Sequence, residues 1–65
     1  MKTQGEQASA LDVPSAAMLL GVSPATIRKW VLIRHLPFYK LGARVIFDRD
    51  ELLRWRESFR IEATA

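Results

Sequence analysis

The chain has 65 residues, with ten lysines and arginines, seven aspartates and glutamates, no cysteine and a formal net charge of +3. This length supports one small domain that buries about 60% of its unfolded surface, and the lack of cysteine excludes disulfides and thiolate metal sites. The first residues lack the apolar core of a signal peptide, and no apolar run approaches the roughly 20 residues that cross a bilayer, so we expect a cytoplasmic protein.

The basic residues are unevenly distributed along the chain. Residues 13–47 hold five of them and no aspartate or glutamate, whereas all seven acids lie outside this stretch. The five are Arg28, Lys29, Arg34, Lys40 and Arg44. An acid-free cationic segment is typical of proteins that bind nucleic acid. The alternative for any one cationic helix face is a solvated surface that has no partner.

Three segments differ in composition. Residues 1–10 are small or polar and show no periodic apolar face, which predicts a flexible leader. Residues 11–60 are expected to form one domain. Residues 61–65 are expected to form a flexible tail.

Two helices joined by a sharp turn are predicted first. Asp12 is expected to cap a helix whose apolar stripe has the spacing i, i+3, i+4, i+7. The stripe consists of Val13, Ala16, Ala17 and Leu20. Gly21 supplies the positive φ that ends a helix, and Ser23 followed by Pro24 begins the next one. The stop and start signals lie so close together that the two helices must cross at a large angle.

The second helix, about residues 24–33, is predicted to have two different faces. Its inward face consists of Ile27, Trp30 and Val31, and its outward face of Ala25, Lys29 and Leu32, with Thr26 and Arg28 on the flanks. A small residue at the leading end would let the helix approach base edges closely. Arginine and lysine would then meet guanine or phosphate oxygens. A helix pair of this kind predicts insertion into the major groove of DNA.

A small β-hairpin with a tip at Gly42 is predicted next, between residues 38 and 47. Phe38, Val45 and Phe47 are candidates for its inward side. Lys40 and Arg44 flank the tip, which suits contact with a phosphate backbone or insertion of an arginine into a minor groove. The alternative is that both cations only keep an exposed hairpin soluble.

A last helix, to about residue 59, is expected to begin with a capping box formed by Asp48 and Glu51. Its apolar stripe is Leu52, Trp55 and Phe59. The mixed charges on its other faces are typical of a solvated helix, so its role is expected to be structural. Trp30 and Trp55 are interpreted as core residues.

This order of elements resembles the excisionase-type, MerR-like winged helix-turn-helix domains of phages, integrating elements and bacterial regulators. The resemblance covers about residues 11–56. It is carried by Leu19-Leu20-Gly21-Val22-Ser23-Pro24, Trp30, Leu36-Pro37, Lys40-Leu41-Gly42, Arg44 and Asp48-Arg49-Asp50-Glu51-Leu52. It implies a mostly α fold with a small β-hairpin, in which the helix from Pro24 is the recognition helix and the hairpin is the wing. The implied DNA-binding residues are Ser23, Ala25, Thr26, Arg28 and Lys29 in the helix, and Lys40 and Arg44 in the wing.

Residues 32–34 depart from the family pattern, which commonly has charged residues and a glycine there. Leu32 is a candidate for contact with a neighbouring protein subunit. Ile33 is expected to pack beneath the following loop; the alternative is that Leu32 and Ile33 are both exposed and contact neighbouring subunits. Arg34 in place of glycine leaves the end of the helix undefined, and its charge makes it a further candidate for phosphate contact.

The domain resemblance alone does not decide the biological role, but a stand-alone winged helix-turn-helix of this size, with no room for the dimerisation helix and effector domain of full MerR-type regulators, is expected to act as an excisionase. Such a protein would be a monomer in solution, bind repeated sites on double-stranded DNA through contacts between neighbouring copies, bend the DNA and direct an integrase towards excision. A small transcriptional regulator is the alternative, and an adaptor for an acidic protein is another. Catalysis finds no support, because the one histidine, His35, has no metal-site spacing around it. No cofactor, metal or membrane partner is expected.

Overall fold

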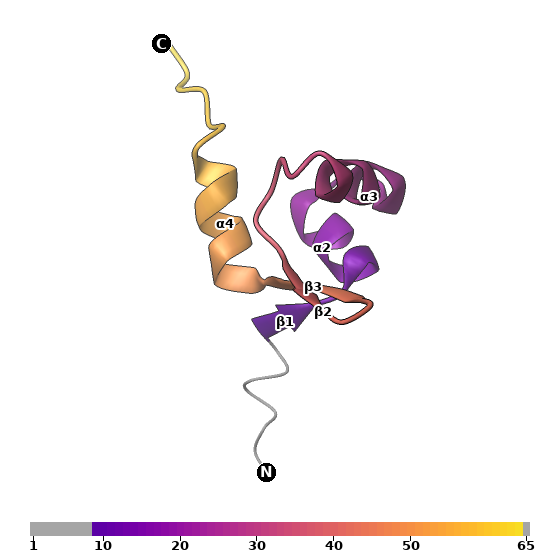
Figure 1. Cartoon of the computed structure of the whole chain (residues 1–65). Coiled ribbons are helices and arrows are strands. Elements are labelled where there is room, and N and C mark those ends of the chain that lie inside the picture. Colours follow the sequence, from indigo (N-terminus) through magenta and orange to yellow (C-terminus); the bar gives the residue numbers. More distant parts are fainter. Residues whose placement is uncertain (1–8, 65) are drawn as a thin grey trace.

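The computed structural model describes residues 9–64 and shows three helices around a small sheet (Figure 1). The elements are β1 (Ala10–Leu11), α2 (Val13–Leu20), α3 (Pro24–Leu32), β2 (Tyr39–Leu41), β3 (Arg44–Asp48) and α4 (Arg49–Glu57). This architecture confirms the predicted winged helix-turn-helix. The predicted leader falls mostly on residues 1–8, which lie outside the described residues, as does residue 65 of the predicted tail.

The helix α2 begins and ends where the sequence predicts. The Asp12 carboxylate accepts a hydrogen bond from the backbone N–H of Ser15 at 2.9 Å, which satisfies one of the free amides of the first turn. Gly21 adopts a left-handed conformation with φ of +74°. The backbone N–H groups of Gly21 and Val22 both donate to the carbonyl oxygen of Ala17, at 2.8 and 3.0 Å. The chain therefore leaves α2 in a tight turn and enters α3 after two more residues.

The end of α3 is built like the end of α2, but with an arginine in place of glycine. Arg34 has φ of +56°, the left-handed conformation that glycine adopts more readily. Its N–H donates to the carbonyl oxygen of Val31 at 3.1 Å, and the N–H of His35 donates to that of Trp30 at 2.8 Å. These two bonds form a Schellman motif. The end of the helix that the sequence left undefined is thus fixed at this position.

The sheet has three antiparallel strands in the order β1-β3-β2. The hairpin of β2 and β3 was predicted, with Gly42 at its tip in a left-handed conformation, φ +63°. The strand β1 was not predicted, because a two-residue strand has no periodicity to detect. It pairs Ala10 with Asp48 and Leu11 with Phe47. Ala10, which the sequence placed in the leader, therefore belongs to the sheet.

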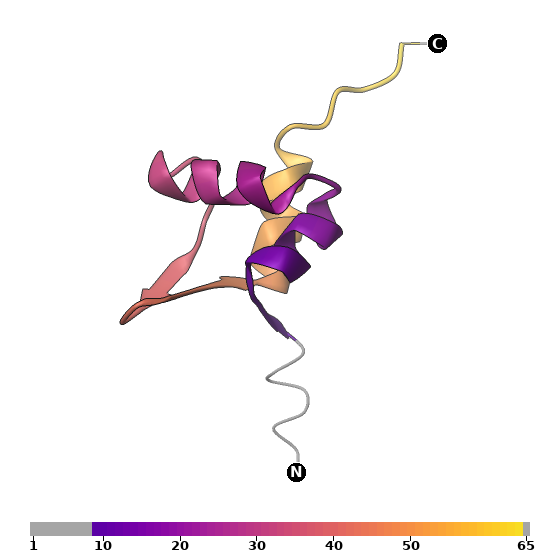
Figure 2. The same cartoon turned by 90° about the vertical axis from the view of Figure 1, so that its right-hand side faces the viewer.

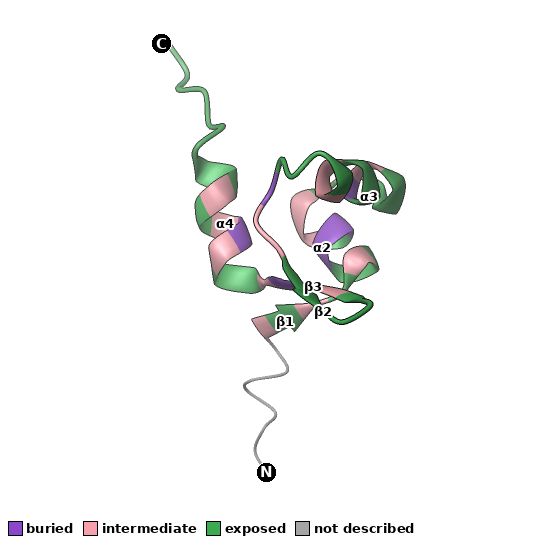
Figure 3. Ribbon diagram, viewed as in Figure 1, coloured by how far each residue is buried: buried purple, intermediate pink, exposed green. Residues whose placement is uncertain are grey.

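One small core joins the three helices, the sheet and the loop before β2 (Figure 3). Its buried members come from all of these parts: Ala16, Ala17, Ile27, Leu36, Phe47 and Leu52. Trp30 and Trp55 are half-buried at its edge. Each helix turns its predicted apolar stripe towards this core, except that Phe59 of the last stripe is not part of it. No helix within residues 9–64 is long and apolar enough to cross a membrane.

The helix α4 starts at the predicted cap and ends two residues earlier than expected. The Asp48 carboxylate accepts a hydrogen bond from the backbone N–H of Glu51 at 2.9 Å. The last helical residue is Glu57, after which the Ser58 hydroxyl donates to the carbonyl oxygen of Trp55 at 2.7 Å. Phe59 lies just beyond the helix and is half exposed, yet its ring packs 4.7 Å from the ring of Trp55.

Candidate nucleic-acid interface

The helix α3, predicted to be the recognition helix, and the hairpin project from the same side of the molecule. Figure 2 shows the far end of α3 and the tip of the hairpin extending in one direction, with α4 and the C-terminal segment on the other side. The core between them fixes their spacing, because Ile27 of α3 and Phe47 of β3 are both fully buried. A surface formed by α3 and the hairpin is therefore held rigidly and faces solvent.

One stripe of α3 is exposed along its whole length. Its members are spaced i, i+3, i+4, i+7, and we call them the outward stripe: Ala25, Arg28, Lys29 and Leu32. Side chains at this spacing share one face of a helix. This face thus presents the methyl group of Ala25 at its start, the cations Arg28 and Lys29 in its middle, and the isobutyl group of Leu32 at its end. The predicted base-reading residues Ala25, Arg28 and Lys29 all lie on this stripe.

Ser23 and Thr26, the other two predicted contacts in this region, hold the start of α3. The Ser23 hydroxyl accepts a hydrogen bond from the backbone N–H of Thr26 at 3.1 Å. The two side-chain hydroxyl oxygens lie 3.0 Å apart, so they also share a hydrogen bond. These hydrogen bonds cap the N-terminus of α3. Thr26 is half-buried, whereas Ser23 is exposed.

Two hollows lie between α3 and the hairpin. The first, of about 350 Å³, is lined by Val13, Arg28, Val31, Leu32 and Val45. The second, of about 790 Å³, extends along the loop before β2, and Leu32, Arg34, Lys40 and Ala43 are among its lining residues. Arg34 and Lys40, one of the two predicted wing cations, therefore line the same hollow. The position of Arg34 could not be predicted from the sequence, because it depends on the left-handed turn at the end of α3.

The two predicted wing cations leave opposite faces of the hairpin. Lys40 pairs with Val45, and Leu41 pairs with Arg44. Paired residues share a face, and successive residues alternate between faces. Lys40 therefore shares the face of Val45, which lines both hollows, whereas Arg44 shares the other face with Leu41. The charge of Arg44 also contributes to lowering the pKa of Asp12, after the larger effect of the hydrogen bonds from Ser15.

Among the described residues, the five cations of residues 13–47 form no ion pair with an acid. Two side-chain ion pairs are present in the described part of the chain, and both lie in α4 or beyond it. They join Arg56 to Glu57 at 3.6 Å and Arg60 to Glu62 at 3.5 Å. The cations on the side of α3 and the hairpin are thus available to phosphate groups.

Leu32 and Ile33 are both exposed at the end of α3. Leu32 is 83% exposed and Ile33 is 62% exposed. The expectation that Ile33 packs beneath the following loop is therefore wrong. The reason lies in the backbone, because the left-handed turn at Arg34 redirects the chain so that Leu36, 4% exposed, fills the core instead.

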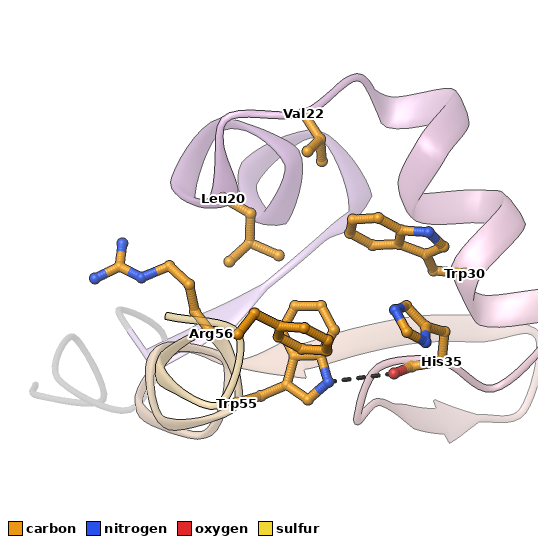
Figure 4. A pocket seen from close by; sticks show the side chains of 7 residues that line it. Leu20, Val22, Trp30, His35, Trp55 and Arg56 are labelled. Atoms are coloured by element: carbon orange, nitrogen blue, oxygen red, sulfur yellow. Dashed lines mark hydrogen bonds between the residues drawn. The ribbon is translucent and has the colours of Figure 1, made fainter. Parts of the chain in front are cut away.

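A separate hollow of about 220 Å³ lies between α4 and the end of α3 (Figure 4). It is lined by Leu20, Val22, Trp30, His35, Trp55, Arg56 and Phe59. Four of these side chains are aromatic or imidazole rings whose centroids lie 4.7–5.8 Å apart, several of them edge to face. This packing anchors the end of α3 on α4. Within residues 9–64, no group of three or more His, Asp or Glu side chains could hold a metal ion.

Comparison with known families agrees with this geometry. A family model described as a helix-turn-helix domain matches residues 10–60, which is most of the chain. The chain belongs to the helix-turn-helix domain family. Comparison with curated proteins and with solved structures gave no significant match. As a helix-turn-helix domain, the protein binds double-stranded DNA, with α2 and α3 as its two characteristic helices.

Proposed function

We propose that the protein is a sequence-specific DNA-binding protein in which α3 enters the major groove and the hairpin lies against the phosphate backbone. The outward stripe of α3 is the observation that carries this proposal. It presents Arg28 and Lys29 to solvent on the side from which the hairpin also projects. Arginine and lysine at such positions recognise guanine through its O6 and N7 atoms.

Salt dependence tests the DNA-binding surface directly. About four or five phosphate contacts release enough counterions to give a slope of roughly −3.5 to −4.5 in a plot of log K against log salt concentration. The probe is a duplex that the full-length protein enriches from a randomised DNA library, titrated at several salt concentrations. A slope near zero, or no binding at low salt, would contradict the proposed surface.

The proposed biological role is that of an excisionase, a factor that directs an integrase towards excision. The resemblance of the whole helix-turn-helix and wing to excisionase-type domains supports this role. The small footprint also supports it, since the nine residues of α3 span only about 13 Å. One such footprint gives limited specificity, so several copies on adjacent sites are needed. Bound copies would together offset the free energy of bending the DNA.

Recombination and binding assays test the excisionase role. Purified protein should bind closely spaced direct repeats cooperatively and bend them, and it should raise excision and lower integration by an integrase encoded beside it. Unchanged recombination in both directions, together with altered transcription from a bound promoter, would support the alternative of a small transcriptional regulator. That alternative uses the same surface of α3 and the hairpin.

A further inference from the structure

Leu32 ends the outward stripe of α3 and is its one large apolar member. From Ala25 to Leu32 the helix rises by about 10 Å, less than the roughly 12 Å width of the major groove of B-DNA. The stripe also has the i, i+3, i+4, i+7 spacing of the groove-reading residues in homeodomain helices. If α3 lies along the groove as a homeodomain helix does, placing Arg28 and Lys29 against base edges brings Leu32, the last residue of α3, to base edges as well.

The surroundings of Leu32 restrict what it can contact. Its side chain is 83% exposed and lines both hollows between α3 and the hairpin. Arg28 lies beside the first hollow, and Arg34 and Lys40 lie beside the second. An apolar side chain that shares its hollows with three cations fits a partner that is apolar where it meets Leu32 and anionic around that point. The major groove of DNA has this chemistry where the C5-methyl group of thymine lies between phosphate chains.

We infer that Leu32 is a specificity-determining residue that packs against the C5-methyl group of a thymine in the bound site. The inference rests on the proposed entry of α3 into the major groove. It adds an apolar contact to the hydrogen bonds of Arg28 and Lys29, so the preferred site contains a thymine next to the guanine or phosphate positions that these cations contact. Leu32 thus acts on sequence preference and contributes little to affinity for unrelated DNA.

Uracil tests this contact, because it differs from thymine only in lacking the C5-methyl group. The probe is the duplex enriched by the full-length protein from a randomised library, resynthesised with uracil in place of one thymine at a time. Loss of one buried methyl contact weakens binding about fourfold. We expect this penalty at one or two thymines for the wild-type protein. For Leu32→Ala, the thymine and uracil duplexes should bind equally.

Met18→Ala is the matched control. Met18 is 84% exposed, close to the value for Leu32, but it lies on α2 and lines neither hollow. This variant should keep the full uracil penalty. Both substitutions remove exposed side chains, and circular dichroism would verify that the variants fold like the wild type.

Three outcomes would overturn the inference while leaving DNA binding intact. The first is a wild-type protein that binds every uracil duplex as tightly as its thymine counterpart. The second is a uracil penalty that persists in Leu32→Ala. The third is loss of cooperativity on repeated sites in Leu32→Ala with the penalty unchanged, which would assign Leu32 to contact between neighbouring copies. Failure of the proposed function itself differs from all three, since no duplex would then be enriched.

Discussion

The indole Nε1 of Trp55 donates a hydrogen bond to the backbone carbonyl oxygen of His35 at 3.2 Å (Figure 4). This bond joins α4 to the chain just after the recognition helix, 20 positions earlier in the sequence. The His35 ring also packs 5.3 Å from the ring of Trp30 and 5.7 Å from that of Trp55. The sequence predicted a structural role for α4, and these contacts define that role: α4 holds the C-terminal end of α3 in place.

Replacing this indole tests the role of the bond. Trp55→Phe keeps an aromatic ring but removes the donor, so we expect the free energy of unfolding to fall by about 1 kcal/mol more than in Trp30→Phe. Trp30 is the matched control, because it is half-buried in the same cluster and its indole makes no hydrogen bond within the described residues. Urea denaturation followed by circular dichroism measures both. Equal losses would show that the bond contributes nothing beyond packing.

Arg34→Gly is expected to change stability and DNA binding in opposite directions. Glycine adopts φ of +56° without the steric cost of a side chain, so the free energy of unfolding should rise by about 0.5–1 kcal/mol. The same change removes a cation from the hollow beside Lys40, so binding to DNA should weaken and the salt slope should decrease. Arg34→Ala separates the two effects, since it removes the charge and leaves the backbone strained. A lower free energy of unfolding for Arg34→Gly than for the wild type would contradict this account.

The stability of α2 should depend on the ionisation of Asp12. Hydrogen bonds from Ser15, and the charge of Arg44 to a smaller extent, lower the pKa of Asp12 from 3.8. Because the folded state holds the carboxylate form, its stabilising effect is complete above pH 3.8 and is lost as the pH falls through the lowered pKa. Asp12→Ala should therefore lower the melting temperature at neutral pH and make no difference once Asp12 is protonated. NMR titration of Arg44→Ala should show a higher pKa for Asp12.

Local signals in the sequence predicted most of the fold. The caps at Asp12, Ser23 and Asp48 and the turn at Gly21 act through hydrogen bonds within three or four residues, and all are present in the structure. The apolar stripes were also correct except for Phe59, which lies beyond the end of α4 and is half exposed, because helical periodicity directly reports which face is buried. The same periodicity predicted three members of the outward stripe of α3, Ala25, Lys29 and Leu32, but it placed Arg28 on the flank of the helix.

The features that the sequence did not reveal depend on contacts between distant residues. Strand β1 exists because Leu11 pairs with Phe47, and a two-residue strand has no pattern of its own. Ile33 is exposed because the turn at Arg34 sends Leu36 into the core. The opposite faces of Lys40 and Arg44 depend on the register of the hairpin, and a shift by one residue would exchange them.

Recognition of bases and contact with the backbone should be separable within α3. Arg28→Ala or Lys29→Ala should reduce the preference for the enriched duplex over a scrambled one, by about 1–3 kcal/mol for each residue that makes a bidentate contact with a base. A residue that contacts only phosphate would weaken binding to both duplexes alike. Competition binding with the two duplexes at constant salt measures the difference. Uniform losses for both variants would show that α3 does not read bases.

The two faces of the hairpin should contribute unequally to DNA binding. Lys40 shares the hollow with Arg34 beside α3, whereas Arg44 leaves the other face of the hairpin and lies close enough to Asp12 to influence its pKa. Lys40→Ala should therefore weaken binding to all sequences and reduce the salt slope by about 1, and Arg44→Ala should have a smaller effect.

Arg54→Ala supplies the control for this comparison, because Arg54 is an exposed cation on α4 and lines neither hollow between α3 and the hairpin. The Arg54→Ala variant loses the same one positive charge as the other two variants, and it should leave the slope of log K against log salt concentration unchanged. Fluorescence anisotropy of the enriched duplex over a range of salt concentrations gives all three slopes. If Arg44→Ala reduced the slope as much as Lys40→Ala, the DNA backbone would have to pass across the tip of the hairpin and contact both of its faces.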